Sequence, residues 1–311
     1  MLTNKTLDEG ATHRIGAQVL KLNDGNTMPM LTRYEFGYGL GTALYKATVG
    51  QKDESIVDMT RLAIEVGYRH LDGAELYNNE EELGDAIRAA DTHRSELFVV
   101  TKLCGTEKRD VQVEFDNSLR RLGLDYVDLY LVHGPYMADN AQDLQNVWSQ
   151  MEAIKRSGKA RSIGVSNFLQ EHLEAILETA EIRPAINSIE YHPYLQRVSL
   201  IEYLREQNIA ISGYSVLSAL TGGSPGPVDE LYAQLARKYN ASEADVALRW
   251  CIDQGIAAIT TTRSERRLRD YSENLGTFKL TQEEIDSIST EGRKKHYRKF
   301  LTNKFASDDH R

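Results

Sequence analysis

Side chains that can transfer protons occur at the ends of successive apolar segments of the sequence. In YRHLDGAELYNNEEELG, residues 68–84, Asp72 ends an apolar segment and Tyr77 follows it five residues later. Lys102 ends the next apolar run, LFVVTK, and His133 ends the one after it, YVDLYLVH. If these runs are neighbouring parallel strands of a barrel, a carboxylate, a phenol, an ammonium group and an imidazole meet at its mouth.

Together these groups are suited to the reduction of a carbonyl group to an alcohol. A phenol has a pKa of about 10, so it is a poor proton donor unless its anion is stabilised. An adjacent ammonium group favours the phenolate and lowers that pKa, while a carboxylate keeps the ammonium group charged and in place. An imidazole can orient the carbonyl and stabilise charge on its oxygen. None of these groups supplies electrons, so we expect a bound cofactor to donate a hydride.

The predicted strands and helices must bring these residues together. An Asp-Gly pair between the apolar runs of VLKLNDGNTMPML predicts an N-terminal β-hairpin. After it, eight short apolar strands alternate with helices, which is typical of a parallel sheet buried on both faces. We predict an α/β fold, a (β/α)8 TIM barrel, as one domain over residues 1–311 with a C-terminal helical extension. The strands are expected in FGYGLGTALY, YRHLDGA, LFVVTKL, YVDLYLVHG, ARSIGVSN, AINSIEYHP, IAISGYSVL and GIAAITTT.

An open, doubly wound sheet is the alternative arrangement of the same elements. A dinucleotide-binding sheet of that kind has G-x-G-x-x-G after its first strand, and the nearest approach here, GYGLGT, ends in Thr42. No Pro- or Ser-rich linker divides the chain, so one closed barrel is favoured. Helices are expected in SIVDMTRLAIEVG, VQVEFDNSLRRLG, DLQNVWSQMEAIKRSG, LQEHLEAILETA and VDELYAQLARKY.

The composition is that of an ordinary globular protein, with 41% hydrophobic and 27% charged residues in 311. A net charge of −9 argues against a nucleic-acid or anionic-membrane surface. Cys104 and Cys251 are the only cysteines, and no apolar run approaches the roughly 20 residues that cross a bilayer. We expect a cytoplasmic monomer with a small-molecule substrate, and no metal, nucleic-acid or membrane partner.

The sequence resembles the aldo-keto reductase superfamily along nearly its whole length. The segments DLYLVHGP, IGVSNF, INSIEYHPYLQ and GYSVL are similar to family motifs and occur in the family's order. The resemblance implies that Tyr77 is the general acid, that Lys102 and Asp72 tune it, and that His133 orients the substrate. The family motif D-x-A-x-x-Y-x-N-E corresponds to Asp72, Ala74, Tyr77, Asn79 and Glu80.

The same resemblance implies a binding site for NADPH (NADP+) across the barrel mouth. Ser166 and Asn167 would hold the nicotinamide carboxamide, Tyr214 would stack on the nicotinamide ring, and the segment from 215 to 218 would lie near the pyrophosphate. The other residues that the resemblance assigns to the cofactor are Gly41, Thr42, Ser188, Ser215, Leu217, Ser218, Thr261, Thr262, Arg263, Ser264 and Arg267.

The segment ITTTRSERRL decides the expected nucleotide. Many relatives have I-P-K-S-x-x-x-x-R here, and this chain has Thr261 and Thr262 at the Lys and Ser positions. Arg263 and Arg267 remain as cations that can bind a 2′-phosphate, which favours NADPH over NADH. The alternative is an exposed helix start whose arginines form i, i+4 ion pairs.

Three departures from the family pattern concern the site. Gly134 replaces a Trp that often follows the His, which predicts a roomier or differently lined mouth. Ser188 replaces a Gln that supports the carboxamide, so that contact is lost or made through water. Leu44 replaces a Trp of the ketoreductase branch.

The Thr-Thr stretch and the segment HYRKF nevertheless resemble the fungal and yeast ketoreductase branch more closely. That branch acts on conjugated polyketones, α-keto lactones and α-keto amides. Residues 218–230, SALTGGSPGPVDE, are either an ordinary surface loop or a flap over the pyrophosphate. The basic segment GRKKHYRKFLTNKF, residues 292–305, is predicted to be a solvated helix, and the resemblance offers the alternative that it shapes the substrate pocket, as C-terminal residues do in relatives.

These features predict an NADPH-dependent carbonyl reductase that transfers a hydride to a ketone or aldehyde, such as an α-dicarbonyl, a conjugated polyketone, a keto lactone or a keto amide. One alternative is a non-catalytic NADP(H)-binding regulatory module on the same fold, which a broken set of four residues would favour. Another is a phosphate-handling isomerase or aldolase, against which the lack of a Gly-rich phosphate loop after the later strands argues. The complete set of Asp72, Tyr77, Lys102 and His133 favours the reductase.

Overall fold

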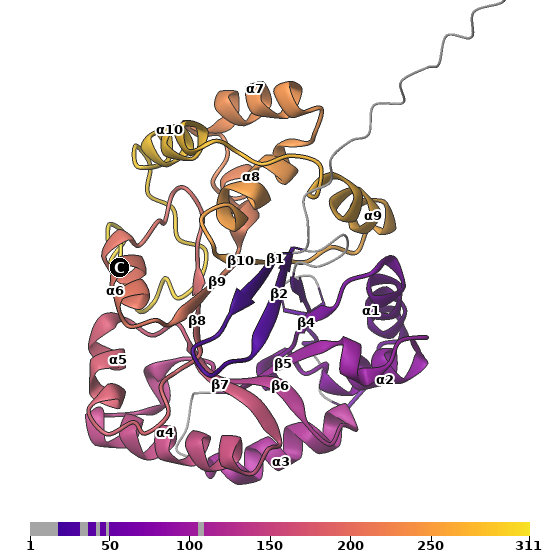
Figure 1. Ribbon diagram of the computed structural model, residues 1–311, viewed down its shortest axis with the longest axis vertical. Coiled ribbons are helices and arrows are strands. Elements are labelled where there is room, and N and C mark those ends of the chain that lie inside the picture. Colours follow the sequence, from indigo (N-terminus) through magenta and orange to yellow (C-terminus); the bar gives the residue numbers. More distant parts are fainter. Residues whose placement is uncertain (1–17, 32–36, 42–43, 48–49, 105–108) are drawn as a thin grey trace, which may run out of the picture.

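In the computed structural model, parallel strands form a closed barrel inside a ring of helices (Figure 1). The structure describes residues 18–31, 37–41, 44–47, 50–104 and 109–311. Within these residues, eight strands close in the order β10-β3-β4-β5-β6-β7-β8-β9, so the predicted TIM barrel is confirmed. They are β3 (Gly37–Gly39), β4 (His70–Asp72), β5 (Phe98–Leu103), β6 (Val127–Val132), β7 (Ala160–Ser166), β8 (Ile186–Glu190), β9 (Ala210–Tyr214) and β10 (Ala257–Thr260).

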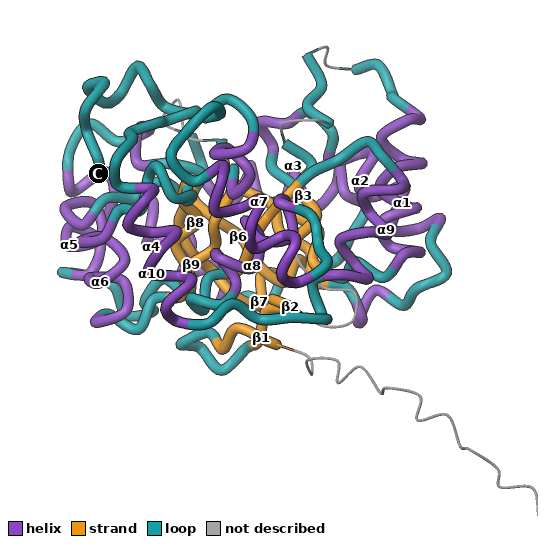
Figure 2. Tube along the Cα trace, turned by 90° about the horizontal axis from the view of Figure 1, so that it is seen from above, coloured by secondary structure: helices purple, strands orange, loops and turns teal. Residues whose placement is uncertain are grey.

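The predicted hairpin covers the amino-terminal end of the barrel, below the strands in Figure 2. It consists of β1 (Gln18–Lys21) and β2 (Thr27–Leu31), which pair antiparallel. Gly25 in its turn has φ +87°, which glycine adopts without steric cost. The Asn26 side-chain amide donates to Arg161 O at 2.9 Å, and that of Asn23 donates to Pro184 O at 2.8 Å, so the turn is held at the starts of β7 and β8. The opposite end of the barrel is left for the site.

Helices follow the strands and cover the outside of the barrel (Figure 1). Their apolar faces are buried, and side-chain caps or left-handed glycines define several ends: Asp53 caps the start of α1, and Gly67 ends it at φ +111°. Gly84 lets α2 approach α3, because a Cβ there would collide with the Leu122 carbonyl. The α-helices are α1 (Glu54–Val66), α2 (Glu80–Ala89), α3 (Val111–Leu122), α4 (Ala141–Arg156), α5 (Gln170–Leu177), α6 (Val198–Glu206), α7 (Asp229–Tyr239), α8 (Glu243–Ile252), α9 (Glu265–Asn274) and α10 (Gln282–Gly292). Short 3-10 helices are η1 (Glu75–Tyr77), η2 (Arg94–Glu96), η3 (Pro135–Met137) and η4 (Val216–Leu220).

The C-terminal segment differs from its prediction. C-terminal helices are present, but the helix predicted over residues 292–305 is wrong, because α10 ends at Gly292 and the following backbone is irregular. Glu190, at the end of β8, accepts hydrogen bonds from Lys299 N at 2.7 Å and Phe300 N at 3.0 Å. A buried carboxylate thus satisfies amides that a helix would otherwise pair. The segment packs over the barrel mouth instead of extending into solvent.

No helix in the described part of the chain combines the length and the apolar character needed to span a bilayer.

Candidate active site

The four predicted residues meet at the carboxyl ends of β4, β5 and β6. Asp72 ends β4, Lys102 lies in β5, His133 directly follows β6, and Tyr77 ends η1. Lys102 Nζ donates to Asp72 Oδ1 at 2.6 Å and to Gly73 O at 2.8 Å. The same ammonium group lies 5.1 Å from the centre of the Tyr77 ring. The rings of Tyr77 and His133 meet edge to face, with centroids 5.6 Å apart.

Tyr77 is positioned by the connection between β3 and α1. The buried Asn79 donates from its side-chain amide to Leu40 O and Leu44 O, both at 2.8 Å. This brings Gly41 against the phenol, since a Cβ on Gly41 would lie 3.1 Å from Tyr77 Cζ. Asn79 belongs to the family motif, but nothing in its spacing indicated that it holds this loop. Thr42, predicted beside Gly41, lies outside the described residues.

Burial and Lys102 act in opposite directions on the Tyr77 phenol. Burial raises the pKa of Tyr77 above its ordinary value, and the neighbouring Lys102 ammonium group offsets part of that rise. The ammonium group of Lys102 thus lowers the Tyr77 pKa as the sequence predicted, but the desolvation of the phenolate is the larger effect, so the net shift is upward. Burial disfavours the charged form of Lys102 as well, but Asp72 and Tyr77 outweigh it and raise the Lys102 pKa.

His133 is held as a neutral imidazole. Burial, aided by the charge of Lys102, lowers the pKa of His133 to about 3. Its Nδ1 is buried and has no hydrogen-bond partner among the described residues. Its main-chain oxygen accepts from Asn167 Nδ2 at 2.9 Å, which joins the end of β6 to the end of β7. The neutral ring can donate one hydrogen bond to a carbonyl oxygen without first losing a proton.

Asn167 connects the residues predicted at the nicotinamide. It has the left-handed backbone φ of +62°, and its side-chain oxygen accepts from the Tyr214 hydroxyl at 2.6 Å. Ser166 Oγ donates to Ser188 O at 2.9 Å, and Asn167 N donates to the same oxygen at 2.9 Å. Ser188, where a Gln was expected from the family, thus contributes its main-chain carbonyl. The ends of β7, β8 and β9 are in this way joined by one hydrogen-bond network.

The residues predicted near the cofactor phosphates lie at the ends of β9 and β10. Ser215 precedes η4, in which Leu217 is half-buried and Ser218 buried. Ser218 Oγ and Thr261 Oγ1 are buried hydroxyls without a partner among the described residues. Two such hydroxyls fit the oxygen-rich phosphates of a dinucleotide, which would satisfy them.

The start of α9 adds a further group of donors. Ser264 caps α9 and accepts from Arg267 N at 3.4 Å, and Thr262 Oγ1 accepts from Ser264 N at 3.0 Å. Arg263 and Arg267 are exposed beside this helix start, which itself favours anions. Among the described residues of α9, ion pairs join Arg266 to Asp270 and Arg269 to Glu265, so these i, i+4 pairs do not use Arg263 or Arg267.

The substitutions noted in the sequence have structural consequences. At Gly134, a Cβ would lie 3.1 Å from Tyr136 Cδ2, so the Tyr136 ring occupies the space above this glycine. The mouth is therefore differently lined rather than simply roomier. Leu44 is fully buried and its carbonyl is held by Asn79. The loop 218–230 is anchored by Lys295 Nζ, which donates to Gly223 O at 2.5 Å and Pro225 O at 2.8 Å. Its movement as a flap stays a prediction.

Comparison with known proteins identifies the family to which this chain is similar. The model of the Aldo/keto reductase family matches residues 38–290. The chain is 37% identical to the NAD/NADP-dependent indole-3-acetaldehyde reductase of Schizosaccharomyces pombe, over 85% of this chain and 93% of that protein. It is 34% identical to the NADPH-dependent alpha-keto amide reductase of Saccharomyces cerevisiae, over 88% and 91%.

A solved structure shows the same fold. The aldo-keto reductase of Bombyx mori in complex with NADP superposes with a TM-score of 0.77 at 35% sequence identity, covering 89% of this chain and 93% of that one. The family match spans all eight barrel strands except the first residue of β3, and the predicted residues meet at the mouth that those strands form. The chain belongs to the aldo/keto reductase family and is an NAD(P)H-dependent oxidoreductase that reduces carbonyl groups.

Proposed function

We propose that the chain is an NADPH-dependent reductase of ketones and aldehydes, with α-dicarbonyl compounds, conjugated polyketones, keto lactones or keto amides as its substrates and Tyr77 as its general acid. The observation that carries this proposal is the buried Asp72–Lys102 ion pair, at 2.6 Å, whose ammonium group faces the Tyr77 ring beside His133. This arrangement suits a proton transfer to an oxygen that is becoming an alkoxide.

The residues divide the reaction between them. When bound at the barrel mouth, NADPH would supply the hydride that the carbonyl carbon needs. Tyr77 breaks its O–H bond and gives the proton to the carbonyl oxygen, which leaves a phenolate. Lys102 stabilises that phenolate, and Asp72 keeps Lys102 charged. His133, neutral at pH 7 because its pKa is about 3, donates a hydrogen bond that orients the carbonyl and stabilises charge on its oxygen.

Bulk water has to return the proton to Tyr77 after each turnover. Because burial raises the pKa of Tyr77, the phenol is the stable form at neutral pH and re-protonation is downhill. The same effect makes the phenol a weaker acid, and Lys102 offsets part of that cost. The Tyr77–Lys102 contact is thus more important here than in a solvent-exposed pair.

Two features support NADPH over NADH. Arg263 and Arg267 lie beside the capped start of α9, where guanidinium groups and main-chain amides can together bind a 2′-phosphate. The relatives described above include one named for NADPH and one solved with NADP. The S. pombe relative is named for both nucleotides, which makes the preference of this chain a question for measurement.

Support for the substrate class comes from the relatives and from the lining of the mouth. The S. cerevisiae relative is named for α-keto amides, which have adjacent carbonyl groups. In this chain the Tyr136 ring lies over Gly134, next to His133, and its hydroxyl is buried without a partner among the described residues. A hydroxyl in that position can donate to the second oxygen of an α-dicarbonyl compound.

The test is NADPH oxidation with a vicinal diketone, an α-keto lactone and a simple benzaldehyde as parallel substrates. We expect Tyr77→Phe to lower kcat by about 10²–10⁴-fold, the usual contribution of general acid catalysis, while NADPH binding, followed by fluorescence, changes little. Tyr130→Phe is the matched control, because the Tyr130 hydroxyl is buried outside the site and has no partner among the described residues.

Either of two results would overturn the proposal. Turnover by Tyr77→Phe at the rate of Tyr130→Phe would remove Tyr77 from the reaction. Equal kcat/KM with NADH and NADPH, unaffected by Arg263→Met and Arg267→Met, would remove the 2′-phosphate site.

A further inference from the structure

Lys46 and Glu82 form a second buried ion pair close to Tyr77, and the proposed reaction does not use it. Lys46 lies in the connection between β3 and α1 and is 9% exposed, and Glu82 lies in the first turn of α2 and is fully buried. Lys46 Nζ is 2.6 Å from Glu82 Oε1. A buried ion pair contributes little net stability, because both charges have been removed from water. What the pair holds in place therefore matters more than its net energy.

The main chain of Lys46 is bonded to the end of η1 in both directions. Lys46 N donates to Tyr77 O at 3.1 Å. Lys46 O accepts from the side-chain amide of Asn78, also at 3.1 Å. The residue proposed as the general acid and the residue after it are thus both tied to Lys46. A displacement of Lys46 is therefore passed directly to the backbone of Tyr77.

Glu82 holds the connection between β3 and α1 at two points. The oxygen that pairs with Lys46, Oε1, also accepts from Asp53 N at 3.0 Å, and Asp53 is the residue that caps the start of α1. The other oxygen of Glu82, Oε2, is buried and has no partner among the described residues. The described hydrogen bonds of this carboxylate therefore all go to the connection, which they fasten to the first turn of α2.

The position of the connection determines how closely the phenol of Tyr77 is packed. Gly41, at the start of the connection, lies so near that a Cβ on it would be 3.1 Å from Tyr77 Cζ and 3.3 Å from the hydroxyl oxygen. Asn79 holds the same segment at Leu40 O and Leu44 O. A shift of about 1 Å in a reacting group can cost about 10²-fold in rate, so a small movement of this connection has a kinetic consequence.

We propose that Lys46 and Glu82 are positioning residues for the carbonyl reduction: their ion pair fixes the β3–α1 connection, which holds the Tyr77 phenol where it can protonate the carbonyl oxygen. The inference rests on the proposed function, in which Tyr77 is the proton donor. In the described contacts, the two side chains act on Tyr77 through the main chain of Lys46. The Asp72–Lys102 pair sets the charge beside the phenol, whereas the Lys46–Glu82 pair sets its place.

The experiment measures a single turnover, with enzyme in excess over NADPH and a vicinal diketone at saturation, from the loss of NADPH absorbance. Only enzyme that has bound NADPH contributes, so a loss of folded protein leaves the rate constant unchanged. We expect Lys46→Met and Glu82→Gln to lower this rate constant by about 10- to 100-fold, while KM for the diketone stays within about threefold. Lys46→Arg keeps a cation that can reach Glu82, so it should recover most of the rate.

Asn78→Asp tests the same inference without touching the ion pair. Asp is close in shape to Asn and also tolerates the left-handed φ of +56° at this position, but its carboxylate cannot donate to Lys46 O. We expect the single-turnover rate constant to fall by about tenfold. This variant decides the question if Lys46→Met or Glu82→Gln fails to fold.

Lys155→Met is the matched control. Lys155 pairs with Asp24 of the N-terminal hairpin at 2.5 Å, and their side chains are 18% and 8% exposed, against 10% and 0% for Lys46 and Glu82. The control therefore leaves a similarly buried carboxylate unpaired, at the end of the barrel opposite the site. Its stability should fall while its single-turnover rate constant stays that of the parent enzyme.

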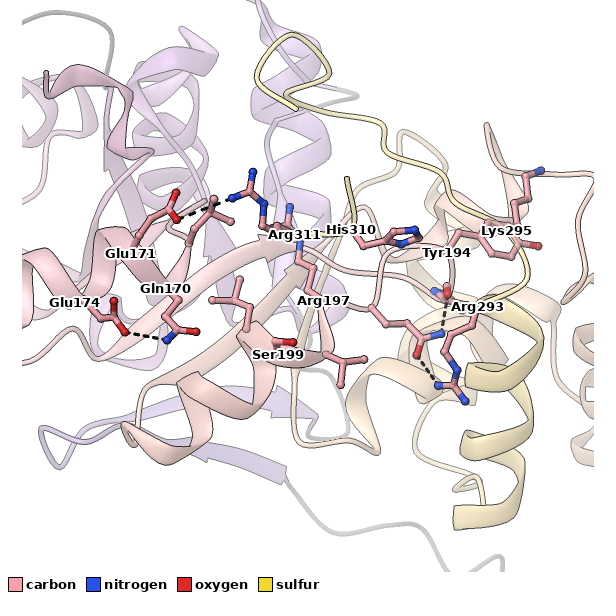
Figure 3. Close-up of a pocket in the computed structure, with 16 residues that line it drawn as sticks. Gln170, Glu171, Glu174, Tyr194, Arg197, Ser199, Arg293, Lys295, His310 and Arg311 are labelled. Atoms are coloured by element: carbon pink, nitrogen blue, oxygen red, sulfur yellow. Dashed lines mark hydrogen bonds and ion pairs between the residues drawn. The ribbon is translucent and has the colours of Figure 1, made fainter. Parts of the chain in front are cut away.

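A second control comes from a cavity outside the site. This cavity, of about 730 Å³, lies between α5, the β8–α6 connection and the end of α10, and none of the four reacting residues lines it (Figure 3). Arg293, exposed at its edge, donates to Gln196 and Thr290. Arg293→Met removes a hydrogen-bonded cation there, as Lys46→Met does beside Tyr77, and should leave the rate constant unchanged.

Three outcomes would overturn the inference. The first is a parent-like rate constant in Asn78→Asp, or in Lys46→Met and Glu82→Gln. The second is an equal fall in Lys155→Met, which would show that any broken buried pair has this effect. The third is a Lys46→Arg variant as slow as Lys46→Met. If Tyr77→Phe is inactive but Lys46→Met is not impaired, this inference fails alone; if Tyr77→Phe turns over normally, the proposed function fails first.

Discussion

Replacement of Asp72 by Asn tests whether the buried ion pair keeps Lys102 in its working state. The side chains of Lys102 and Asp72 are 3% and 7% exposed, and Nζ lies 2.6 Å from Oδ1. With an effective dielectric constant of about 20, opposite charges at this distance attract by about 6 kcal/mol. The cost of removing both ions from water offsets most of this attraction, so the pair itself contributes little net stability.

Removing one partner has a larger effect than the net contribution of the pair. An unpaired charge left in the interior costs about 3–5 kcal/mol. Lys102 keeps its hydrogen bond to Gly73 O, so we expect Asp72→Asn to lower the free energy of unfolding by about 3 kcal/mol, at the low end of that range. In the double variant Asp72→Asn/Lys102→Met no buried charge is left over, and the loss should be smaller than the sum of the single losses by about 2 kcal/mol.

The assay is urea unfolding of the four proteins of this cycle, together with kcat for a vicinal diketone. We expect kcat to fall by at least about tenfold in every variant, because each one removes the ammonium group or the carboxylate that holds it charged. Asp253→Asn is the control: it breaks the buried Arg249–Asp253 pair of α8, so stability should fall while kcat stays the same. Additive stability losses, within about 0.5 kcal/mol, would refute the reasoning.

Two further predictions concern stability. Gly84→Ala should destabilise the chain by about 1–3 kcal/mol, because its Cβ meets the Leu122 carbonyl, whereas Gly276→Ala, with open space around it, should be nearly neutral in the same urea titration. The fully buried His70 has its pKa lowered by burial to about 4, so on acidification the unfolded chain, at about 6.5, takes up the proton first and stability falls between these two values. At about 1.4 kcal/mol per pH unit over the 1.5 units between about 6.5 and 5, His70→Phe should lose about 2 kcal/mol less than the parent chain between pH 7 and pH 5, and equal losses would show that His70 does not titrate in this window.

The barrel and the convergence of its reacting groups could be predicted from the sequence, because both depend on local sequence patterns. Each strand is a short apolar run, and polar side chains that follow such runs in a parallel barrel converge on one end. Asp72, Lys102 and His133 are placed in this way, and the structure brings them together with Tyr77. Their roles in catalysis stay predictions, but their proximity required only the order of the strands.

The net direction of the Tyr77 pKa shift could not be predicted from the sequence in the same way. The sequence shows that an ammonium group and a phenol are neighbours, and from that alone a lowered pKa follows. Burial depends on how completely the loops around η1 close, here through Asn79 and Gly41, and its effect is larger. The balance between these two opposing effects cannot be obtained from residue spacing.

The C-terminal segment shows most clearly which features could not be predicted from the sequence. Its lysines and arginines predicted a solvated helix, but its backbone amides at 299 and 300 find their acceptor in Glu190, more than one hundred residues earlier in the chain. Helix propensity depends on the local sequence. It therefore cannot account for hydrogen bonds to a buried carboxylate at the end of a distant strand. The same applies to Gly134, whose consequence depends on the Tyr136 ring above it.

The reacting groups and the segment over the barrel mouth belong to different parts of the chain. Lys102 and His133 lie at strand ends and Tyr77 ends η1, beside the β3–α1 connection that Asn79 holds, so the barrel and this connection position all three. Phe300, which meets the Tyr214 ring edge to face at 5.8 Å, is placed over the mouth by the hydrogen bond of its own amide to Glu190. We therefore expect changes in the C-terminal segment to alter which substrates the enzyme accepts without moving Tyr77. Glu190→Gln, which weakens the hydrogen bonds that hold this segment, should reduce selectivity among substrates before it affects the rate of the chemical step.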